Sequence, residues 1–600
     1  MASTFFGLNI GTSGLYTYQA AINTTAHNAA NAETKGYTRQ VLNTQASLPI
    51  SIYTSYGMVG TGVTGTSITQ IRENYYDVKF RGNTSIQAEY SKKSYYMTQV
   101  QNYFNELDDD GFIKAMNNFS GVLQDLSTDP SSYANRTSAM QYALTMTNHV
   151  NSVATNLQSI QQDVNQEIKS SVDRINSLSQ QITMLTQQIN TLEIGGQKAN
   201  DLRDSRNNLL DELSQYANIT VEENIVQGGT GMTTFVVRMD GKVLVNTYEY
   251  NTLTCVPRED KVNETDVDGL YDLYWSDGEE FNENSLSLTG TLAGLFAMRD
   301  GNNNVNFKGT VKEQKTETDG TKKITLTNAS INSEIGLNLP ESGTIQIGNY
   351  KVAYTSFDMK LDANGNMEYT FVLDKNDSNS TRNFVAGETA QVGDPVDYKG
   401  IPYYMNKLNE FVRTFAKEFN DIHKQGVNLE GETGVDFFTA KDLVTGEDKT
   451  LYGIGDTMSA SNSYAQMNCL NFTVSSVIKD NPNAIATSKD SSSGVEDTEL
   501  LKELIAKLSD STMFNQGTPQ SFLQTFVADI GIYTKEAETA TKSQENIVNA
   551  IETQRMSISG VDTDEEAMNL VRYQNAYNLS AKVIQIMDEI YDKLINYTGV

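Results

Sequence analysis

Both ends of the 600-residue chain carry apolar side chains in heptad spacing, and this constrains the fold more than any other feature. The N-terminal set comprises Leu8, Leu15, Tyr18, Ile22 and Ala29. The C-terminal set comprises Leu570, Tyr573, Tyr577, Ile584, Met587, Tyr591 and Leu594. Intervals of three, four and seven residues place such side chains along one edge of a helix, as a coiled-coil seam requires. Neither stripe can be buried by its own helix, so the sequence predicts that the two ends pair with each other or with neighbouring copies.

The terminal segments are too polar to fold alone. Residues 1–40 are rich in Asn, Thr, Ala and Gly and offer little apolar surface for burial. Isolated helices of this length are marginal in water. We therefore expect residues 1–60 and 560–600 to form one inner assembly domain that is disordered in the monomer.

Long helices are predicted for the body. Apolar residues recur every three or four positions from about Arg136 to Ile194, which predicts a helix roughly 90 Å long. A second helix follows over 199–216, and a third begins at Pro402. A late stripe over 523–551 predicts a helix packed antiparallel on the early one, as in a helical bundle. We assign residues 61–218 and 402–559 to this bundle domain.

Smaller elements follow from local signals. The first helix is expected from Ser13 to Gly36, and residues 41–90 are expected to form loop and weak strand before helix resumes over 91–107. The last helix is expected to begin with a capping box at Thr563–Glu566.

The middle of the chain has strand periodicity. Residues 219–300 form a β-rich segment, and residues 301–400 alternate apolar and polar groups between turn sequences such as 302–304, 318–321 and 362–366. The second block is predicted to be a β outer domain inserted between helices. The fold class is therefore α+β multidomain, with terminal N and C helices forming coiled-coil and antiparallel helical-bundle domains and with inserted β-rich outer domains.

Composition excludes several classes of partner. The formal net charge of −30 argues against nucleic acid and anionic membrane surfaces, which bind basic patches. No apolar run approaches the roughly 18–20 residues of a membrane-spanning helix. The first basic residue is Lys35, so the N-terminus lacks the charged region of a cleaved signal peptide. Cys255 and Cys469 are the only cysteines, which excludes a disulfide scaffold and a cysteine-rich zinc site.

No catalytic or metal-binding pattern is present. His27, His149 and His423 lie far apart in the sequence, and there is no HExxH pair. The Asp362-Ala-Asn-Gly-Asn stretch resembles the start of a calcium loop, but Met367 and Leu373 occupy the positions that require Gly and Glu, so a hairpin turn is favoured. The sequence predicts no enzyme, no metal and no cofactor.

Residues 26–40 contain a recognisable motif. The segment Ala-His-Asn-Ala-Ala-Asn-Ala-Glu-Thr-Lys-Gly-Tyr-Thr-Arg-Gln resembles the N-terminal motif of the bacterial flagellar rod, hook and hook-associated proteins. The matching positions are Asn28, Asn31, Thr34, Gly36 and Tyr37. This motif marks the axial superfamily without identifying the member.

Three further segments, residues 199–214, 415–438 and 559–578, resemble the signatures of the first hook-associated protein family. Together with the motif they cover both ends and most of the helical body. The sequence differs from the family pattern in the middle. About a hundred residues separate Asp300 from Pro402, although in the family the helix that begins at Pro402 often follows soon after the segment that ends at Asp300.

The resemblance implies a structural adaptor that polymerises as a ring at the distal end of the flagellar hook and joins hook to filament. It implies export through the flagellar type III apparatus without a cleaved signal, and a cytosolic export chaperone on the C-terminal segment. The implied partners are further copies of the chain, the hook protein and the filament-side hook-associated protein. The assembly interface is then expected to comprise the motif residues and all of the heptad residues given above except Ala29.

Two alternatives remain open. The chain could be another axial protein, either hook protein or the filament-side junction protein. It could also be a secreted adhesin acting through residues 301–400, which an isolated block binding host glycan would support.

Overall fold

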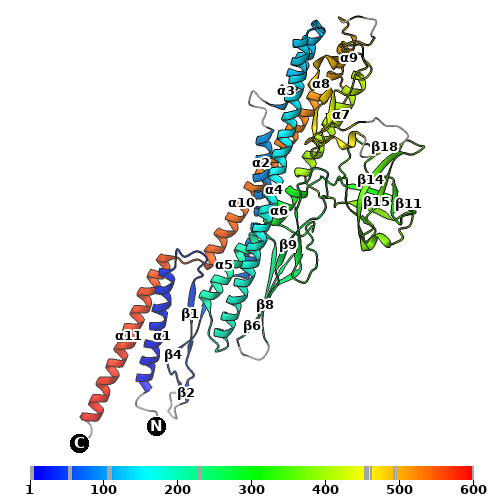
Figure 1. Ribbon diagram of the computed structural model, residues 1–600. Helices are drawn as coiled ribbons and strands as arrows, with labels where there is room; N and C mark the ends of the chain where they lie inside the picture. The colour runs from blue at the N-terminus through cyan, green and yellow to red at the C-terminus, as the bar shows by residue number, and fades with distance from the viewer. Residues whose placement is uncertain are drawn as a thin grey trace.

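The computed structural model describes residues 6–51, 57–104, 111–226, 231–451, 458–459, 463–490, 494 and 496–597. The chain is an elongated rod of long helices with β-sheets attached to its side, and both chain ends lie at the same end of the rod (Figure 1). This arrangement confirms the predicted α+β class with terminal helices and inserted β-rich regions.

The terminal helices α1 (Phe6–Ala30) and α11 (Thr563–Asn596) pack side by side (Figure 1). The strands β1 (Gln40–Ala46) and β4 (Val63–Gln70) form an antiparallel hairpin that contacts α1, and β2 (Ile50–Ser51) pairs with β3 (Met58–Val59).

The predicted bounds of the terminal helices need correction. Helix α1 begins before Ser13 and ends at Ala30, because the following residues form a tight turn in which Gly36 has a φ of 75°. The capping box at Thr563 is also wrong, since Asp562 is the N-cap and its Oδ1 accepts hydrogen bonds from the backbone of Asp564 and Glu565.

The body contains the helices α2 (Asn74–Tyr103), α3 (Phe112–Thr128), α4 (Tyr133–Glu193), α5 (Asn200–Tyr216) and α10 (Pro519–Ser559). Helix α4 confirms the predicted long helix. Helix α10 packs along α2 and not on α4, which corrects the predicted pairing. Thr534 of α10 donates from its hydroxyl to the Met97 carbonyl of α2 at 3.3 Å. The faces of α4 are instead covered by α3, α5 and two later helices, α6 (Thr291–Asp300) and α7 (Ile401–His423).

Helix α2 begins 17 residues earlier than expected. Its first half buries Asp77, Arg81, Thr84 and Ser85, so the buried face is polar there. Such a face carries no apolar periodicity in the sequence.

The β-rich segment consists of a four-stranded sheet and a hairpin. The sheet has the order β5 (Ile219–Ile225), β6 (Thr233–Met239), β7 (Lys242–Asn246) and β8 (Glu249–Tyr250), and all neighbours are antiparallel. Strands β9 (Leu253–Pro257) and β10 (Tyr271–Trp275) pair with Leu273 opposite Cys255.

A closed sheet with its own apolar core forms the outer β region. Its order is β13-β16-β11-β12-β15-β14-β18, and a β13–β14 pairing closes it. The bounds are β11 (Phe307–Thr316), β12 (Lys322–Thr327), β13 (Gly343–Ile347), β14 (Tyr350–Leu361), β15 (Met367–Leu373), β16 (Thr389–Val392) and β18 (Met458–Ser459). Strand β18 comes from outside residues 301–400.

Two of the three turn predictions hold. The chain turns between β11 and β12, and between β14 and β15, where Asp362 Oδ1 accepts from the backbone of Asn364 and Asn366 at 2.8 Å. Residues 302–304 instead connect α6 to β11, so they do not form a hairpin.

The far end of the rod is held together by aromatic rings. It contains β17 (Phe438–Ala440), β19 (Phe472–Val474), α8 (Ser476–Asp480) and α9 (Glu499–Leu508), with short 3-10 turns at Tyr464–Gln466 and Pro482–Ala484. A further 3-10 turn, Ser378–Thr381, lies against β14 of the closed sheet. Phe119 of α3 contacts rings from α7 and β17, and Phe411 stacks on Phe415 and Phe514. Pro402 lies in the first turn of α7, as predicted.

Arg413 of α7 connects the body to the closed sheet. Its side chain is fully buried, and its guanidinium donates to the carbonyls of Leu337 and Ala465 and to the Glu264 carboxylate. The Ala465 carbonyl and the Glu264 carboxylate each lie 2.6 Å from Nη2. One side chain therefore joins segments that are far apart in sequence.

We predict that Arg413→Met lowers the free energy of unfolding by about 3–5 kcal/mol, because it leaves a carboxylate and buried carbonyls without their donor. The measurement is the urea unfolding midpoint followed by circular dichroism. Lys417→Met, one turn later on α7, is the control, because the ion pair that Lys417 forms within the described residues is with Asp421 on the same helix, and its loss is expected to change stability by about 0.5 kcal/mol or less. Equal shifts of the unfolding midpoint in the two variants would contradict the role assigned to Arg413.

Candidate functional site

The terminal helices pack through small residues. Gly7, Gly11 and Gly14 of α1 face Met587, Ile584 and Ser580 of α11, so the partner number falls as the α1 number rises and the helices are antiparallel. A Cβ atom on Gly11 would lie 2.7 Å from Ile584 Cγ1, and one on Gly14 would lie 2.6 Å from Ser580 Oγ. Real Cβ atoms do not approach so closely, and glycine therefore sets the spacing of the two helices.

The predicted α1 heptad residues lie beside this contact line. Leu8, Leu15, Tyr18 and Ile22 are half-buried, and Ala29 is exposed. The buried residues of α1 are Gly11, Gly14, Thr17, Ala21, Thr24, Thr25 and Asn28. The pairing of the two ends was therefore predictable, whereas its seam was not, because glycine and threonine carry no heptad signal.

The predicted α11 residues divide into two groups. Tyr573, Tyr577, Ile584, Met587 and Tyr591 are half-buried. Leu570 and Leu594 are 37% and 46% exposed. The first group has the spacing of the residues that face α1.

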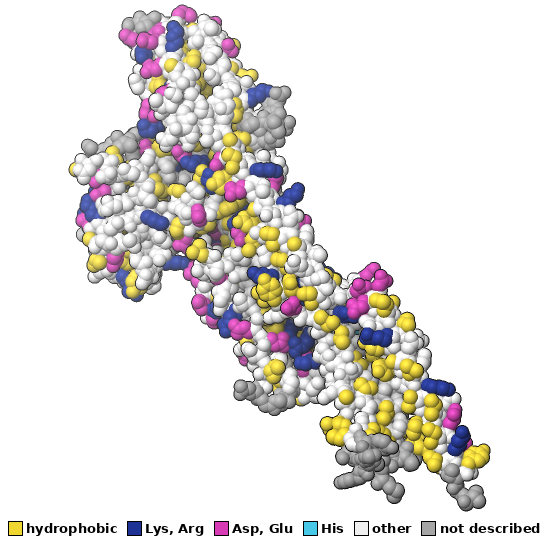
Figure 2. Space-filling model, turned by 180° about the vertical axis from the view of Figure 1, so that it is seen from behind, with side chains coloured by type: hydrophobic (Ala, Val, Ile, Leu, Met, Phe, Trp, Pro, Cys, Tyr) yellow, Lys and Arg dark blue, Asp and Glu magenta, His cyan; other side chains and the backbone are white. Residues whose placement is uncertain are grey.

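A second apolar stripe on α11 was missed. Leu579, Val583, Ile586 and Ile590 are 68%, 40%, 46% and 42% exposed. Each precedes a residue of the α1-facing stripe, so the second stripe lies about 100° around the helix from the first. Its intervals of four, three and four residues are a heptad signal in their own right. Figure 2 shows hydrophobic side chains gathered along this end of the rod.

The N-terminal motif builds the turn that leads from α1 into β1. Asn28 donates from Nδ2 to the Gln40 carbonyl at 2.8 Å, and its Oδ1 accepts from the Gln40 backbone at 3.0 Å and the Tyr37 hydroxyl at 2.8 Å. Thr34 donates from its hydroxyl to Asn31 Oδ1 at 3.2 Å. A Cβ atom on Gly36 would lie 1.7 Å from an Asn208 side-chain oxygen. The structure brings these motif residues together within one chain; their presence in an interface between copies remains a prediction.

Burial affects the ionisation of Tyr37 in this turn. It raises the pKa of Tyr37 above its usual range, with Asp201 and Asp204 adding to the effect. The Tyr37 hydroxyl therefore stays protonated and able to donate to Asn28.

The residues after the motif attach the chain ends to the body. Thr38 donates from its backbone and its hydroxyl to Asp204 of α5 at 2.9 and 2.7 Å. Arg39 Nε donates to Glu566 Oε1 at 2.7 Å, its two Nη atoms donate to Glu565, and its backbone N–H donates to the Ser559 carbonyl. Burial alone would lower the pKa of Arg39, but its hydrogen bonds to these carboxylates raise it. We call residues 28–40 with Asp204, Ser559, Glu565 and Glu566 the joint.

Within the described ranges, no group of three or more His, Cys, Asp or Glu residues is arranged to hold a metal ion. The three histidines lie on different helices, α1, α4 and α7. His423 is fully buried, and burial lowers its pKa to about 4; its Nε2 accepts from the Ala486 backbone at 2.9 Å. This makes His423 a structural residue.

Among the described helices none has the length and hydropathy needed to cross a membrane. Both described cysteines are free, with Cys469 buried and Cys255 half-buried. At this end of the rod the described residues make helix contacts and ion pairs.

The chain is similar along nearly its whole length to proteins that share one name. The flagellar hook-associated protein 1 of Bacillus subtilis (strain 168) is 26% identical over 611 aligned residues, covering 100% of this chain and 99% of the relative. The protein of the same name from Salmonella typhimurium is 25% identical, covering 98% of this chain and 99% of the relative. A solved structure of the flagellar hook junction protein FlgK from Burkholderia pseudomallei aligns with a TM-score of 0.45 and 14% identity, covering 80% of this chain and 100% of that one.

Two family profiles match. Residues 552–596 match the profile described as flagellar basal body rod FlgEFG protein C-terminal. Residues 97–321 and 323–438 match the flagellar hook-associated protein FlgK helical domain. The second match runs through residues 301–400 with only residue 322 left out, and the departure of this block from the family stays a prediction. Because this match spans more than half of the sequence, the chain belongs to the FlgK family of flagellar hook-associated proteins.

Proposed function

We propose that this chain is the adaptor that joins the flagellar hook to the filament, polymerising as a ring at the distal end of the hook. The observation that carries the proposal is the apolar stripe on α11, formed by Leu579, Val583, Ile586 and Ile590, in a member of this family. Burial of the exposed half of these four side chains contributes about 3–6 kcal/mol per copy. A closed ring repeats that contribution at every contact.

The total surface supports an assembling subunit. The chain exposes 29158 Å², whereas a compact monomer of 66.4 kDa exposes about 21,000 Å². Exposed aromatic and aliphatic side chains extend along the body as well, including Tyr75, Val78 and Tyr95 of α2 and Ile532 of α10. These residues offer a lateral contact surface beyond the terminal helices.

The radial arrangement follows from the same proposal. Residues 1–60 and 560–600 form the inner shell around the central channel, residues 61–218 and 402–559 the next shell, and the β regions 219–300 and 301–400 face outward. The joint transmits the position of the inner shell to the body, because Arg39 contacts both α11 and the end of α10.

Export and partners complete the proposal. The chain leaves the cell unfolded through the flagellar type III apparatus, and a cytosolic chaperone binds residues 560–600 before assembly. The exposed apolar face of α11 is a surface such a chaperone would cover. The ring then contacts hook protein on one side and the filament-side hook-associated protein on the other. This role is structural and requires no catalysis, metal or cofactor.

We predict that cells lacking the gene form hooks without filaments and shed flagellin monomers into the medium. The measurement is electron microscopy of the cells together with an assay of flagellin in the supernatant. Absence of the hook itself would favour the hook-protein alternative. Intact filaments would overturn the junction role and direct the search to an adhesive function of residues 301–400.

We predict that Ile586→Glu abolishes attachment to the hook while leaving the monomer folded. The side chain is 46% exposed and lies off the α1-facing stripe, so the charge costs little in the monomer but several kcal/mol once buried between copies. Incorporation into hook ends should fall at least 100-fold.

Gln574→Glu is the matched control, because Gln574 is also exposed on α11 and the charge change is identical. Circular dichroism of both purified variants checks the fold, and complementation of the deletion strain checks assembly. Normal filaments on cells that carry only Ile586→Glu would refute the role of this stripe.

A further inference from the structure

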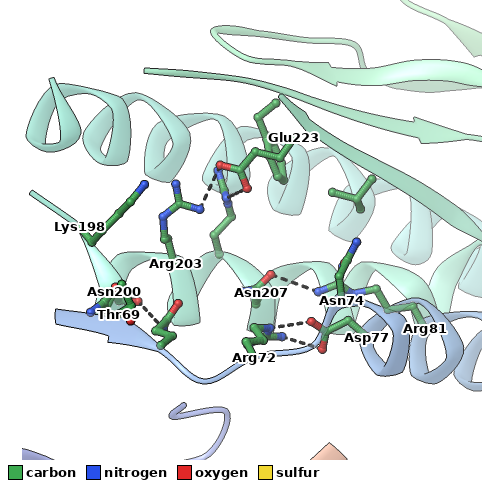
Figure 3. Close-up of a pocket in the computed structure, with 14 residues that line it drawn as sticks. Thr69, Arg72, Asn74, Asp77, Arg81, Lys198, Asn200, Arg203, Asn207 and Glu223 are labelled. Carbon is green, nitrogen blue, oxygen red and sulfur yellow. Dashed lines mark hydrogen bonds and ion pairs between the residues drawn. The ribbon is translucent and has the colours of Figure 1, made fainter. Parts of the chain in front are cut away.

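A polar cavity of about 370 Å³ lies where the hairpin, α2, α5 and the four-stranded sheet meet. Lys198, Arg203 and Glu223 stand on one side, and Arg72, Asp77 and Arg81 stand on the other (Figure 3). The chain as a whole carries a net charge of −30, whereas the lining of this cavity holds five cations and two carboxylates.

The side of the cavity formed by α2 is electrically balanced. Arg72 pairs with Asp77 and Asp204, and Arg81 pairs with Asp211 at 2.7 Å. Arg555 of α10 pairs with Asp77, Asp211 and the exposed Glu552. None of these three cations is left without a carboxylate.

The opposite side has an excess of positive charge. Lys198 Nζ lies 3.1 Å from Glu193 Oε2, and Arg203 contacts both Glu193 and Glu223 at 2.7 and 3.0 Å. Arg206 Nη2 shares the Glu223 carboxylate at 2.8 Å. Three cations therefore share two carboxylates.

Arg206 carries the excess. Its side chain is 2% exposed, and its Cζ atom lies 3.7 Å from the centre of the Phe235 ring. Its Nε and Nη1 atoms have no hydrogen-bond acceptor among the described residues. Burial lowers the pKa of Arg206 to about 10, as expected for a buried cation with incomplete compensation.

The other three fully buried arginines differ from Arg206 in that their side-chain nitrogens all have acceptors. Arg136 donates to the carbonyls of Pro130 and Ile485, and Arg299 donates to Asp300, Glu283 and the Tyr271 carbonyl. Arg413 is satisfied as described above. No nitrogen of these three side chains is left without an acceptor in the described part of the chain.

Two helix N-termini add to the positive potential. The first residues of α2 and α5, Asn74 and Asn200, both line the cavity. Their N-cap residues, Glu73 and Ala199, make no side-chain capping hydrogen bond within the described chain. Uncapped first-turn N–H groups and the helix dipole both favour an anion at this position.

We propose that this cavity is a binding site for an oxyanion of the carboxylate class. A carboxylate supplies the missing countercharge of Arg206 and matches the paired donors of an arginine. It has two possible sources: a free small carboxylate, or an acidic side chain from a second copy of this highly acidic chain. The site does not depend on the junction role, and its test does not use filament assembly.

The test uses purified full-length chain and malonate as the probe, titrated by calorimetry at constant ionic strength. Malonate should bind the unmodified chain. Its affinity should be at least about tenfold lower for Arg206→Gln and about fivefold lower for Lys198→Gln. Lys198 is 41% exposed, so this second variant keeps its fold even if Arg206→Gln does not. Lys242→Gln is the control, because Lys242 pairs with Asp277 and Glu279 outside the cavity, and it should bind malonate like the unmodified chain.

Sedimentation velocity at low salt separates the two sources. Self-association that is lost in Lys198→Gln and retained in Lys242→Gln, without malonate binding, assigns the carboxylate to a second copy. Malonate binding that depends on Lys198 and Arg206 assigns it to a free anion. Equal behaviour of all variants in both measurements, or the absence of both effects in the unmodified chain, overturns the proposal.

Discussion

The position of the terminal helix pair depends on the contacts of Arg39. Its guanidinium reaches Glu565 and Glu566 at the start of α11, while its backbone N–H donates to the last residue of α10, Ser559. Glu566 is 2% exposed, so one of these ion pairs is shielded from solvent, unlike an ordinary surface pair. Arg39 thus links the end of α10, through its backbone, to the start of α11, through its side chain.

The terminal pair and the joint are built from different forces. Glycines bring α1 and α11 together over a narrow line, so the larger apolar side chains of α11 are only partly used within the chain. The joint is polar and well hydrogen-bonded, with Asn28 at its centre. This combination gives a subunit whose geometry is fixed by directional contacts and whose apolar surface remains available for neighbouring copies.

Much of the fold was predictable where one periodicity dominates. Helix α4 buries apolar residues along its whole length, and the turns near Asp319 and Asp362 contain the glycine that a hairpin needs. The start of α2 was missed because its buried face consists of Asp77, Arg81 and hydroxyl groups. The pairing of α10 with α2 was missed because a stripe reports that a helix is buried and does not report which helix covers it. At the level of single residues the limit is the same: a motif identifies Asn28 and Gly36, but only the structure shows that Asn28 holds the backbone of Gln40 and that Gly36 avoids a collision with Asn208.

Long-range polar contacts also explain how so extended a chain stays together. A rod has little interior for its length, so distant segments cannot all meet in one apolar core. Buried arginines supply part of the missing cohesion, since Arg136 of α4 reaches the Ile485 carbonyl and Arg413 of α7 reaches the Leu337 carbonyl. Each is stabilising only while all its acceptors are present. A buried arginine without its full set of acceptors, such as Arg206, therefore marks a place where the chain alone is electrostatically incomplete.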